Sequence, residues 1–150
     1  MIKIPAILLL VIALSFAPLS PIARAATVQV VTITLQDASV DPSISRMVMT
    51  TDASSVKAGR VTLEAVNQSK TLVHEVLVVL ALQEGKEFPY DTKKATLVEK
   101  RMHSLGEISE LKPGAHGMLT LNLKPGTYVL LCNQPGHYKS GMSTLLVVEK

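Results

Sequence analysis

Residues 117–149 read GMLTLNLKPGTYVLLCNQPGHYKSGMSTLLVVE, and this stretch decides the expected fold. Gly117 to Leu123 alternates apolar and polar residues, which is typical of a strand with one buried face. Thr127 to Cys132 and Ser143 to Glu149 are rich in aliphatic and β-branched residues and predict two further strands. The turn signal Lys124-Pro125-Gly126 separates the first two strands. The C-terminal third is therefore expected to be built of short strands.

The same pattern extends toward the N-terminus. Thr27 to Gln36 and Val61 to Asn67 have strand composition, and Val73 to Leu82 is almost continuously apolar, as expected of a strand buried on both faces. Turn signals stand between them at Lys57-Ala58-Gly59 and Asn67-Gln68-Ser69, and a further one is Lys112-Pro113-Gly114. Short strands spaced by glycine and proline turns predict an all-β sandwich or barrel.

One segment departs from this pattern. Gln83 to Ser104 is polar, and Asp91 to Arg101 within it has neither glycine nor proline. Asp91 could cap a short helix there. We interpret the segment as a short helical or irregular excursion between the two sheets of a single domain.

Residues 1–25 have the features of a secretory signal peptide. Lys3 gives a positive start, Ile7 to Leu14 is an apolar run, and Ala23-Arg24-Ala25 offers small residues at the cleavage positions. A membrane anchor is the alternative, but the apolar run falls short of the roughly 18 residues that a spanning helix needs. We expect cleavage after Ala25, a mature domain over residues 26–150, and no membrane insertion.

Composition narrows the possible functions. Loss of Lys3 and Arg24 with the signal peptide, and of no acidic residue, lowers the formal net charge from +3 to +1. The chain has five aromatic residues and no tryptophan, so a stacking platform for bases is not expected. A nearly neutral mature chain also lacks the cationic surface on which nucleic-acid binding depends, and no nucleic-acid partner is expected.

The chemistry concentrates in one loop. Cys132, His137 and Met142 follow a C-x4-H-x4-M pattern between two predicted strands, and Cys132 is the only cysteine of the chain. Thiolate and thioether sulfur suit Cu(I), imidazole suits both copper oxidation states, and two His with one Cys and a long axial Met form a blue-copper site. The sequence therefore predicts a single copper ion.

Such a site needs a second His. The candidates are His74, His103 and His116. His74 begins an apolar strand, from which a rigid side chain can point to the end of a sandwich where the Cys–Met loop lies. The other two lie in polar or turn-like surroundings, and we favour surface positions for them.

Two other groups of residues have simpler interpretations. Met47 and Met49 would face the same side of a strand, as in exported Cu(I) carriers, but core filling is the favoured interpretation. Lys93, Lys94, Lys100 and Arg101 could steer an acidic redox partner, but a solvated helix face is favoured.

In these residues the chain resembles the plastocyanin/azurin-type cupredoxins, and its C-x4-H-x4-M spacing resembles that of the rusticyanin- and auracyanin-type members. Lys124-Pro125-Gly126-Thr127-Tyr128 is similar to the family's entry into the Cys strand, and Val61 to His74 to its strand–turn–His segment. The resemblance implies a Greek-key β-sandwich with His74, Cys132 and His137 as equatorial ligands and Met142 as the axial one. It also implies that electrons leave through the ring edge of His137.

The resemblance includes one departure. Many members follow the first His with Asn or Ser, whose side chain helps to tie the two ligand loops together, whereas Glu75 stands there in this chain.

The function expected is that of a monomeric, soluble electron shuttle that is periplasmic or otherwise exported. Its partners would be redox proteins such as cytochromes or membrane oxidoreductases. The alternative is a periplasmic copper carrier or resistance protein, and a purely structural cupredoxin-fold protein is a third. An enzyme is not expected, because the chain is short for a multicopper oxidase or nitrite reductase and has too few His for further copper centres.

Overall fold

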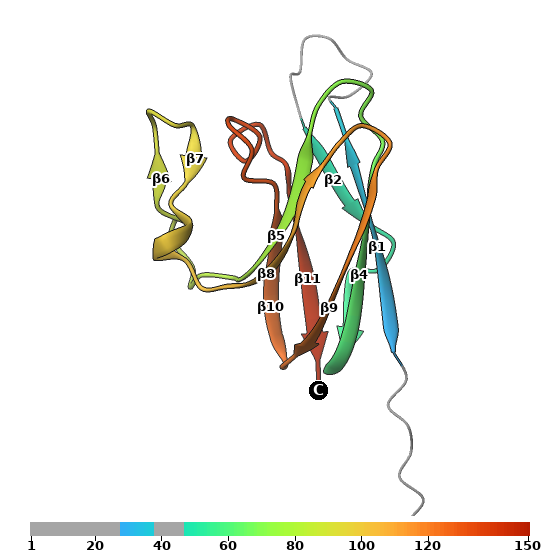
Figure 1. Cartoon of the computed structure of the whole chain (residues 1–150). Coiled ribbons are helices and arrows are strands. Elements are labelled where there is room, and N and C mark those ends of the chain that lie inside the picture. The colour runs from blue at the N-terminus through green and yellow to red at the C-terminus, as the bar shows by residue number, and fades with distance from the viewer. Residues whose placement is uncertain (1–27, 38–46) are drawn as a thin grey trace, which may run out of the picture.

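Two β-sheets pack face to face in the computed structural model, which describes residues 28–37 and 47–150 (Figure 1). The first sheet has the order β2-β1-β4-β9 and the second the order β3-β11-β10-β5-β8. Strands β1 and β4 pair in parallel, as do β3 and β11, so both sheets are mixed. The predicted all-β sandwich is confirmed.

The bounds of the strands in the first sheet are β1 Gln29–Gln36, β2 Val48–Thr51, β4 Gly59–Asn67 and β9 His116–Leu123. In the second sheet they are β3 Ser55–Lys57, β5 His74–Leu80, β8 Ser104–Leu111, β10 Gly126–Leu131 and β11 Ser143–Glu149. The six predicted strands are all present, with ends that differ by a few residues. The proposed signal peptide lies outside the described residues.

Strand β5 is buried on both faces, as predicted. Val76 and Val78 face the core between the sheets, whereas Leu77 and Val79 belong to a second apolar cluster on the outer face of the same sheet. All four side chains are at most 2% exposed. A strand that is buried on both faces needs a cover on each, and the next segment of the chain supplies the outer one.

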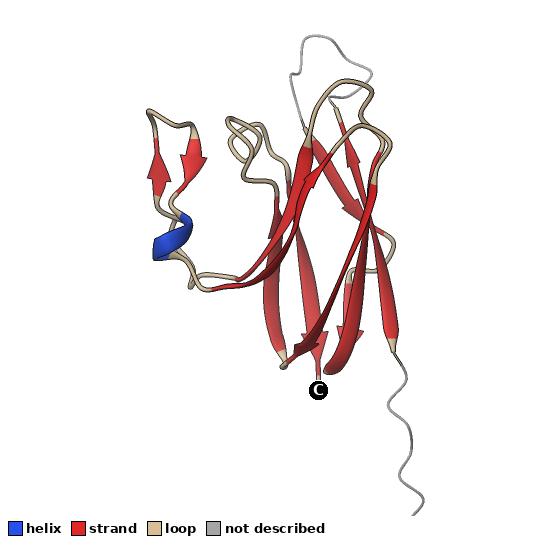
Figure 2. Cartoon of the chain, viewed as in Figure 1, coloured by secondary structure: helices blue, strands red, loops and turns tan. Residues whose placement is uncertain are grey.

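That cover is the predicted excursion, which in the structure spans residues 81–103 between β5 and β8. It contains the short hairpin β6 (Tyr90–Asp91) and β7 (Thr96–Leu97) and one 3-10 turn, η1 (Glu99–Arg101), the only helical element among the described residues (Figure 2). The expectation that it passes between the two sheets was wrong. It connects β5 to β8, which are neighbours in one sheet.

The helix expected after Asp91 is also absent from the described residues. Asp91 lies in β6, and its carboxylate accepts the backbone N–H groups of Lys93 and Lys94 at 2.9 and 3.2 Å. This closes a hairpin turn instead of capping a helix. The basic residues Lys93 and Lys94 are therefore exposed in that turn, and Lys100 and Arg101 are exposed on η1, so they do not share a helix face.

The sheets converge where β8 meets β9. A β-carbon added at Gly117 of β9 would overlap the Ile108 side chain of β8, and one added at Gly106 would lie 3.1 Å from Leu119. The absence of side chains at these positions lets two strands from opposite sheets approach closely. Among the described residues no helix is long and apolar enough to cross a bilayer.

Candidate metal centre

Two neighbouring strands bring His74 and Cys132 to one end of the second sheet. His74 is the first residue of β5, and Cys132 directly follows β10. The strands are antiparallel, with Leu131 opposite Leu77, so the start of β5 lies beside the end of β10. The strand pairing alone therefore places these two side chains together, although 58 positions separate them in the chain.

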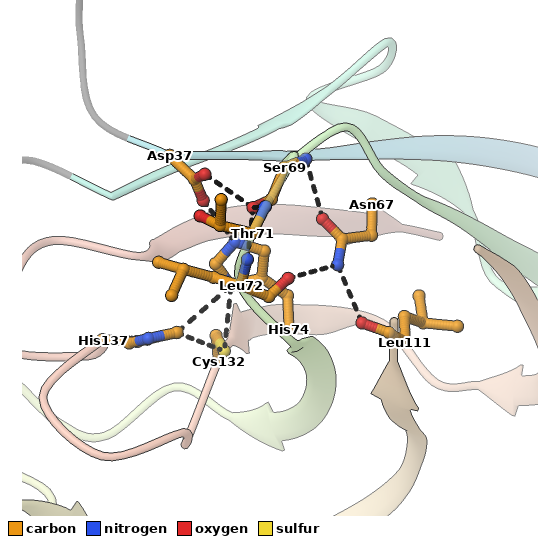
Figure 3. Close-up of polar contacts among 9 residues, drawn as sticks. All are labelled: Asp37, Asn67, Ser69, Thr71, Leu72, His74, Leu111, Cys132 and His137. Carbon is orange, nitrogen blue, oxygen red and sulfur yellow. Dashed lines mark hydrogen bonds and ion pairs between the residues drawn. The ribbon is translucent and has the colours of Figure 1, made fainter. Parts of the chain in front are cut away.

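The loop from β10 to β11 adds His137. The Cys132 Sγ atom lies 3.4 Å from Nδ1 of His137 and 3.9 Å from Nδ1 of His74, and the two Nδ1 atoms are 3.1 Å apart (Figure 3). In the described part of the chain this is the single group of three His, Cys, Asp or Glu side chains with metal-ligating atoms within 4.8 Å of one another. The sequence prediction of these three residues thus agrees with the geometry.

Backbone hydrogen bonds shape the loop that carries His137 and Met142. The carbonyl of Met142 accepts the N–H of Cys132 at 3.1 Å, and the N–H of Met142 donates to the carbonyl of His137 at 3.1 Å. Gly136 and Gly141 take the left-handed conformation that these tight turns require, with φ of 83° and 90°. Met142 is completely buried and belongs to the same core cluster as Cys132. Its role as a ligand stays a prediction.

The other two histidines lie outside this cluster. His103 and His116 are both exposed, and His116 belongs to β9 of the opposite sheet.

A contact that sequence reasoning missed orients His74. Its Nε2 atom lies 3.1 Å from the Asp37 carboxylate, which also accepts a hydrogen bond from Ser69 Oγ at 2.6 Å. A carboxylate on Nε2 favours the tautomer with the proton on that nitrogen, which leaves Nδ1 unprotonated and directed toward Cys132. Asp37 follows β1 and is 37 positions from His74. No local pattern links the two residues. The parallel pairing of β1 with β4 places the end of β1 beside the turn that precedes His74, and this brings Asp37 near the ring.

The buried side chain of Asn67 fixes the turn before His74 through hydrogen bonds. Asn67 donates its amide hydrogens to the carbonyls of Leu72 and Leu111 at 2.9 and 2.7 Å and accepts the N–H of Ser69 at 2.9 Å. Asn67 is fully buried, and among the described residues no buried side-chain nitrogen or oxygen lacks a partner. A satisfied buried amide of this kind holds one loop geometry.

Glu75 makes the tie between the ligand loops that the resemblance assigns to Asn or Ser. Its carboxylate accepts the N–H of Asn133 at 2.9 Å and the side-chain amide of Gln134 at 3.1 Å. Burial raises the pKa of Glu75, and these hydrogen bonds partly offset that increase. The departure from the family pattern thus changes the residue and keeps the connection.

The surroundings of Cys132 disfavour a free thiolate in the metal-free protein. Burial raises the pKa of the Cys132 thiol to about 11, although the backbone N–H groups of Gln134 and Glu75 act in the opposite direction. Burial, and then the neighbouring His74, lower the pKa of His137. A catalytic cysteine needs a lowered pKa, whereas a metal ion deprotonates its thiol ligand directly. The site thus offers two imidazole nitrogens and a thiol that a metal ion would convert to thiolate.

The raised pKa predicts how the metal-free protein responds to alkali. The thiol of an unfolded chain loses its proton near pH 9, whereas folded Cys132 keeps its proton until about pH 11, so deprotonation favours unfolding between these values. The free energy of unfolding should therefore fall by about 1.4 kcal/mol per pH unit in this interval. Urea unfolding across it is the measurement. Cys132→Ala should remove the contribution of the thiol to the decrease of the unfolding free energy with pH. An equal decrease in both proteins would contradict the raised pKa of Cys132.

No family model matches the chain, and no curated protein sequence does. Solved structures do match. A dithionite-reduced auracyanin from the photosynthetic bacterium Roseiflexus castenholzii is 23% identical, with a TM-score of 0.52 over 79% of this chain and 97% of that one. Auracyanin B is 25% identical, with a TM-score of 0.55 over 79% and 88%. Rusticyanin from Thiobacillus ferrooxidans is 15% identical, with a TM-score of 0.57 over 81% and 78%.

These similarities agree with the expected resemblance. Two sheets in a sandwich carry, at one end, a buried thiol between two imidazoles whose Nδ1 atoms face it. The chain has the cupredoxin fold, and its group of His74, Cys132 and His137 fits a type 1 copper site.

Proposed function

We propose that this chain is an exported type 1 copper protein that carries single electrons between redox proteins. The observation that carries the proposal is the convergence of Cys132 Sγ with the Nδ1 atoms of His74 and His137 in a buried site. Copper, when bound, would supply a one-electron couple between Cu(II) and Cu(I). Rusticyanin is described as a copper protein, and one of the similar auracyanins was studied in its reduced state.

The donor set is the reason for choosing copper. One thiolate and two imidazoles in a plane, with a weak thioether beside them, suit a metal that alternates between a softer and a harder oxidation state. We assign His74, Cys132 and His137 to the plane and Met142 to the axial position. Zinc also binds Cys and His, but its sites rarely use a thioether.

The copper assignment has a spectroscopic test. Protein from residue 26 onward, loaded with Cu(II), should show the intense visible absorption of thiolate-to-copper charge transfer and lose it reversibly on reduction. Cys132→Ala should abolish the colour, because the chain has no other thiol. A colourless complex in the unsubstituted protein would contradict the proposal.

Histidine variants provide the matched controls. His74→Ala and His137→Ala should each disrupt the spectrum, whereas His103→Ala and His116→Ala should leave it unchanged, because both of these side chains are exposed away from the cluster. Added imidazole should restore the His137 variant better than the His74 variant, since His137 is 9% exposed and His74 is completely buried.

A further prediction concerns Met142. An axial thioether donates weakly and stabilises Cu(II) more than Cu(I), so Met142→Leu should keep copper and colour while raising the reduction potential. Met142→Gln supplies a harder oxygen donor and should lower it. Cyclic voltammetry measures both shifts. An unchanged potential in both variants would remove Met142 from the ligand set.

The carrier alternative receives no support from the M-x-M pair. Met49 is 5% exposed and belongs to the core cluster, and Met47 is partly buried against it. Both thioethers therefore fill the core. Carriers need open sites that exchange metal, whereas the proposed ligands here are buried. Asp37 holds His74, and Glu75 holds the backbone of the residue after Cys132.

Shuttle and carrier predict opposite results in one pair of measurements. Reduced protein mixed with an oxidised cytochrome should transfer its electron rapidly and keep its copper. The same protein mixed with a Cu(I) chelator should lose copper slowly. Release requires the buried ligand cage, formed by His74, Cys132, His137 and Met142, to open. Prompt copper loss with slow electron transfer would favour the carrier.

The export of the protein is proposed from its N-terminal sequence and from the need for an oxidising compartment to which Cu(II) has access.

A further inference from the structure

The excursion lies against the loop of residues 132–142 between β10 and β11, which we call the ligand loop. The proposed electron transfer through His137 does not require this contact. Figure 1 shows the β6–β7 hairpin rising beside the loop between β10 and β11. The N–H of Gly136 in the ligand loop donates to the carbonyl of Ala95 in the hairpin turn at 2.7 Å. Ala95 has φ of 55°, a strained value for a residue with a side chain. The strained turn thus presents its carbonyl to the ligand loop.

Apolar packing supports the same contact. Leu97 of β7 is buried together with Leu131, the residue before Cys132, in the outer cluster of the second sheet. Tyr138 of the ligand loop and Phe88 of the excursion meet edge to face, with ring centroids 6.4 Å apart. The excursion therefore packs against both ends of the segment that holds Cys132 and His137.

Asn133 is the polar centre of this contact. Its Oδ1 accepts the N–H of Leu97 at 2.6 Å, and its Nδ2 donates to the carbonyl of Leu97 at 3.2 Å and to the Glu99 carboxylate at 2.7 Å. The side chain is 6% exposed. An amide group that pairs with both backbone groups of one residue imitates a neighbouring strand, and the bond to a carboxylate is of the stronger, charge-assisted kind.

The backbone of Asn133 is held by a different segment, strand β5. Its N–H donates to Glu75 in β5, whereas its side chain binds the excursion. The residue next to Cys132 is thus held between two segments that are far apart in sequence. Neither set of contacts includes a metal ligand atom, so both can form in the metal-free protein.

We propose that Asn133 is a positioning residue that couples the excursion to the Cys–Met loop and holds that loop in place. The inference rests on the proposed copper site for its consequence, which is slow opening of the cage. The coupling itself concerns only protein groups. A loop held in this way changes little between oxidation states and exposes the metal rarely.

The test uses the full mature chain with Asn133→Ala, and Asn122→Ala as the matched control, since Asn122 is exposed on β9 of the other sheet. Amide hydrogen exchange is measured by NMR on metal-free protein, and loss of Cu(I) to a chelator on the loaded protein. Asn133→Ala should increase exchange at the amides of Leu97 and Gly136 by about tenfold or more, because their protecting contacts lose a buried partner. It should also speed copper loss, and the control should change neither.

The outcomes separate the coupling from the copper assignment. If the Gly136 amide exchanges at the same rate in Asn133→Ala as in the unsubstituted protein, the coupling is overturned. This holds for any result of the copper-loss measurement. If the unsubstituted protein never develops the thiolate–copper colour, the proposed function fails while the exchange result still decides the coupling. Should Asn133→Ala not fold, Glu99→Ala removes only the bond from Nδ2 to an exposed side chain. It should then raise exchange at Leu97 by a smaller factor, and no increase there would count against the proposal.

Discussion

The antiparallel pairing of β5 with β10 is the constraint on which the rest of the site depends. It places the start of one strand beside the end of the other, so that His74 and Cys132 meet at one end of the sheet. Because both residues are attached to buried strands, their backbones cannot shift without disturbing the core. The loop that follows Cys132 needs only a few residues to bring His137 to the same place, and its two glycines permit the turns.

Burial of the site imposes a second requirement. Polar groups removed from water must find partners, and each residue flanking the cluster does so in a different part of the fold. Asp37 binds Nε2 of His74, and Glu75 binds the backbone beside Cys132. The side chain of Asn133 binds the excursion. These contacts leave the Nδ1 atom of His74 and the Sγ atom of Cys132 free to face one another. The groups that satisfy burial therefore also position the proposed ligands.

Local patterns in the sequence predicted much of this arrangement. The alternation of Gly117 to Leu123 and the apolar run after Val73 predicted strands, and the C-x4-H-x4-M spacing predicted the loop. Strand β8 escaped prediction because bulges interrupt its pairing with β5 and its buried residues, Ile108 and Leu111, are three apart instead of two. The Asp37–His74 contact and the contacts of Asn133 with Leu97 and Glu99 escaped because they join segments with no shared periodicity, and only tertiary structure brings them together.

The excursion follows from the burial of β5 on both faces. An apolar strand in a two-layer sandwich has one face toward the core, and its outer residues Leu77 and Val79 need a cover that the opposite sheet cannot provide. The chain therefore leaves the sheet after β5, covers that face with Leu97 and its neighbours, and returns as β8. Once this cover lies beside β10, its hairpin also reaches the loop that follows Cys132. The same segment thus covers the apolar outer face of β5 and contacts the loop that follows Cys132. These two roles explain why an irregular polar stretch interrupts an otherwise regular succession of strands.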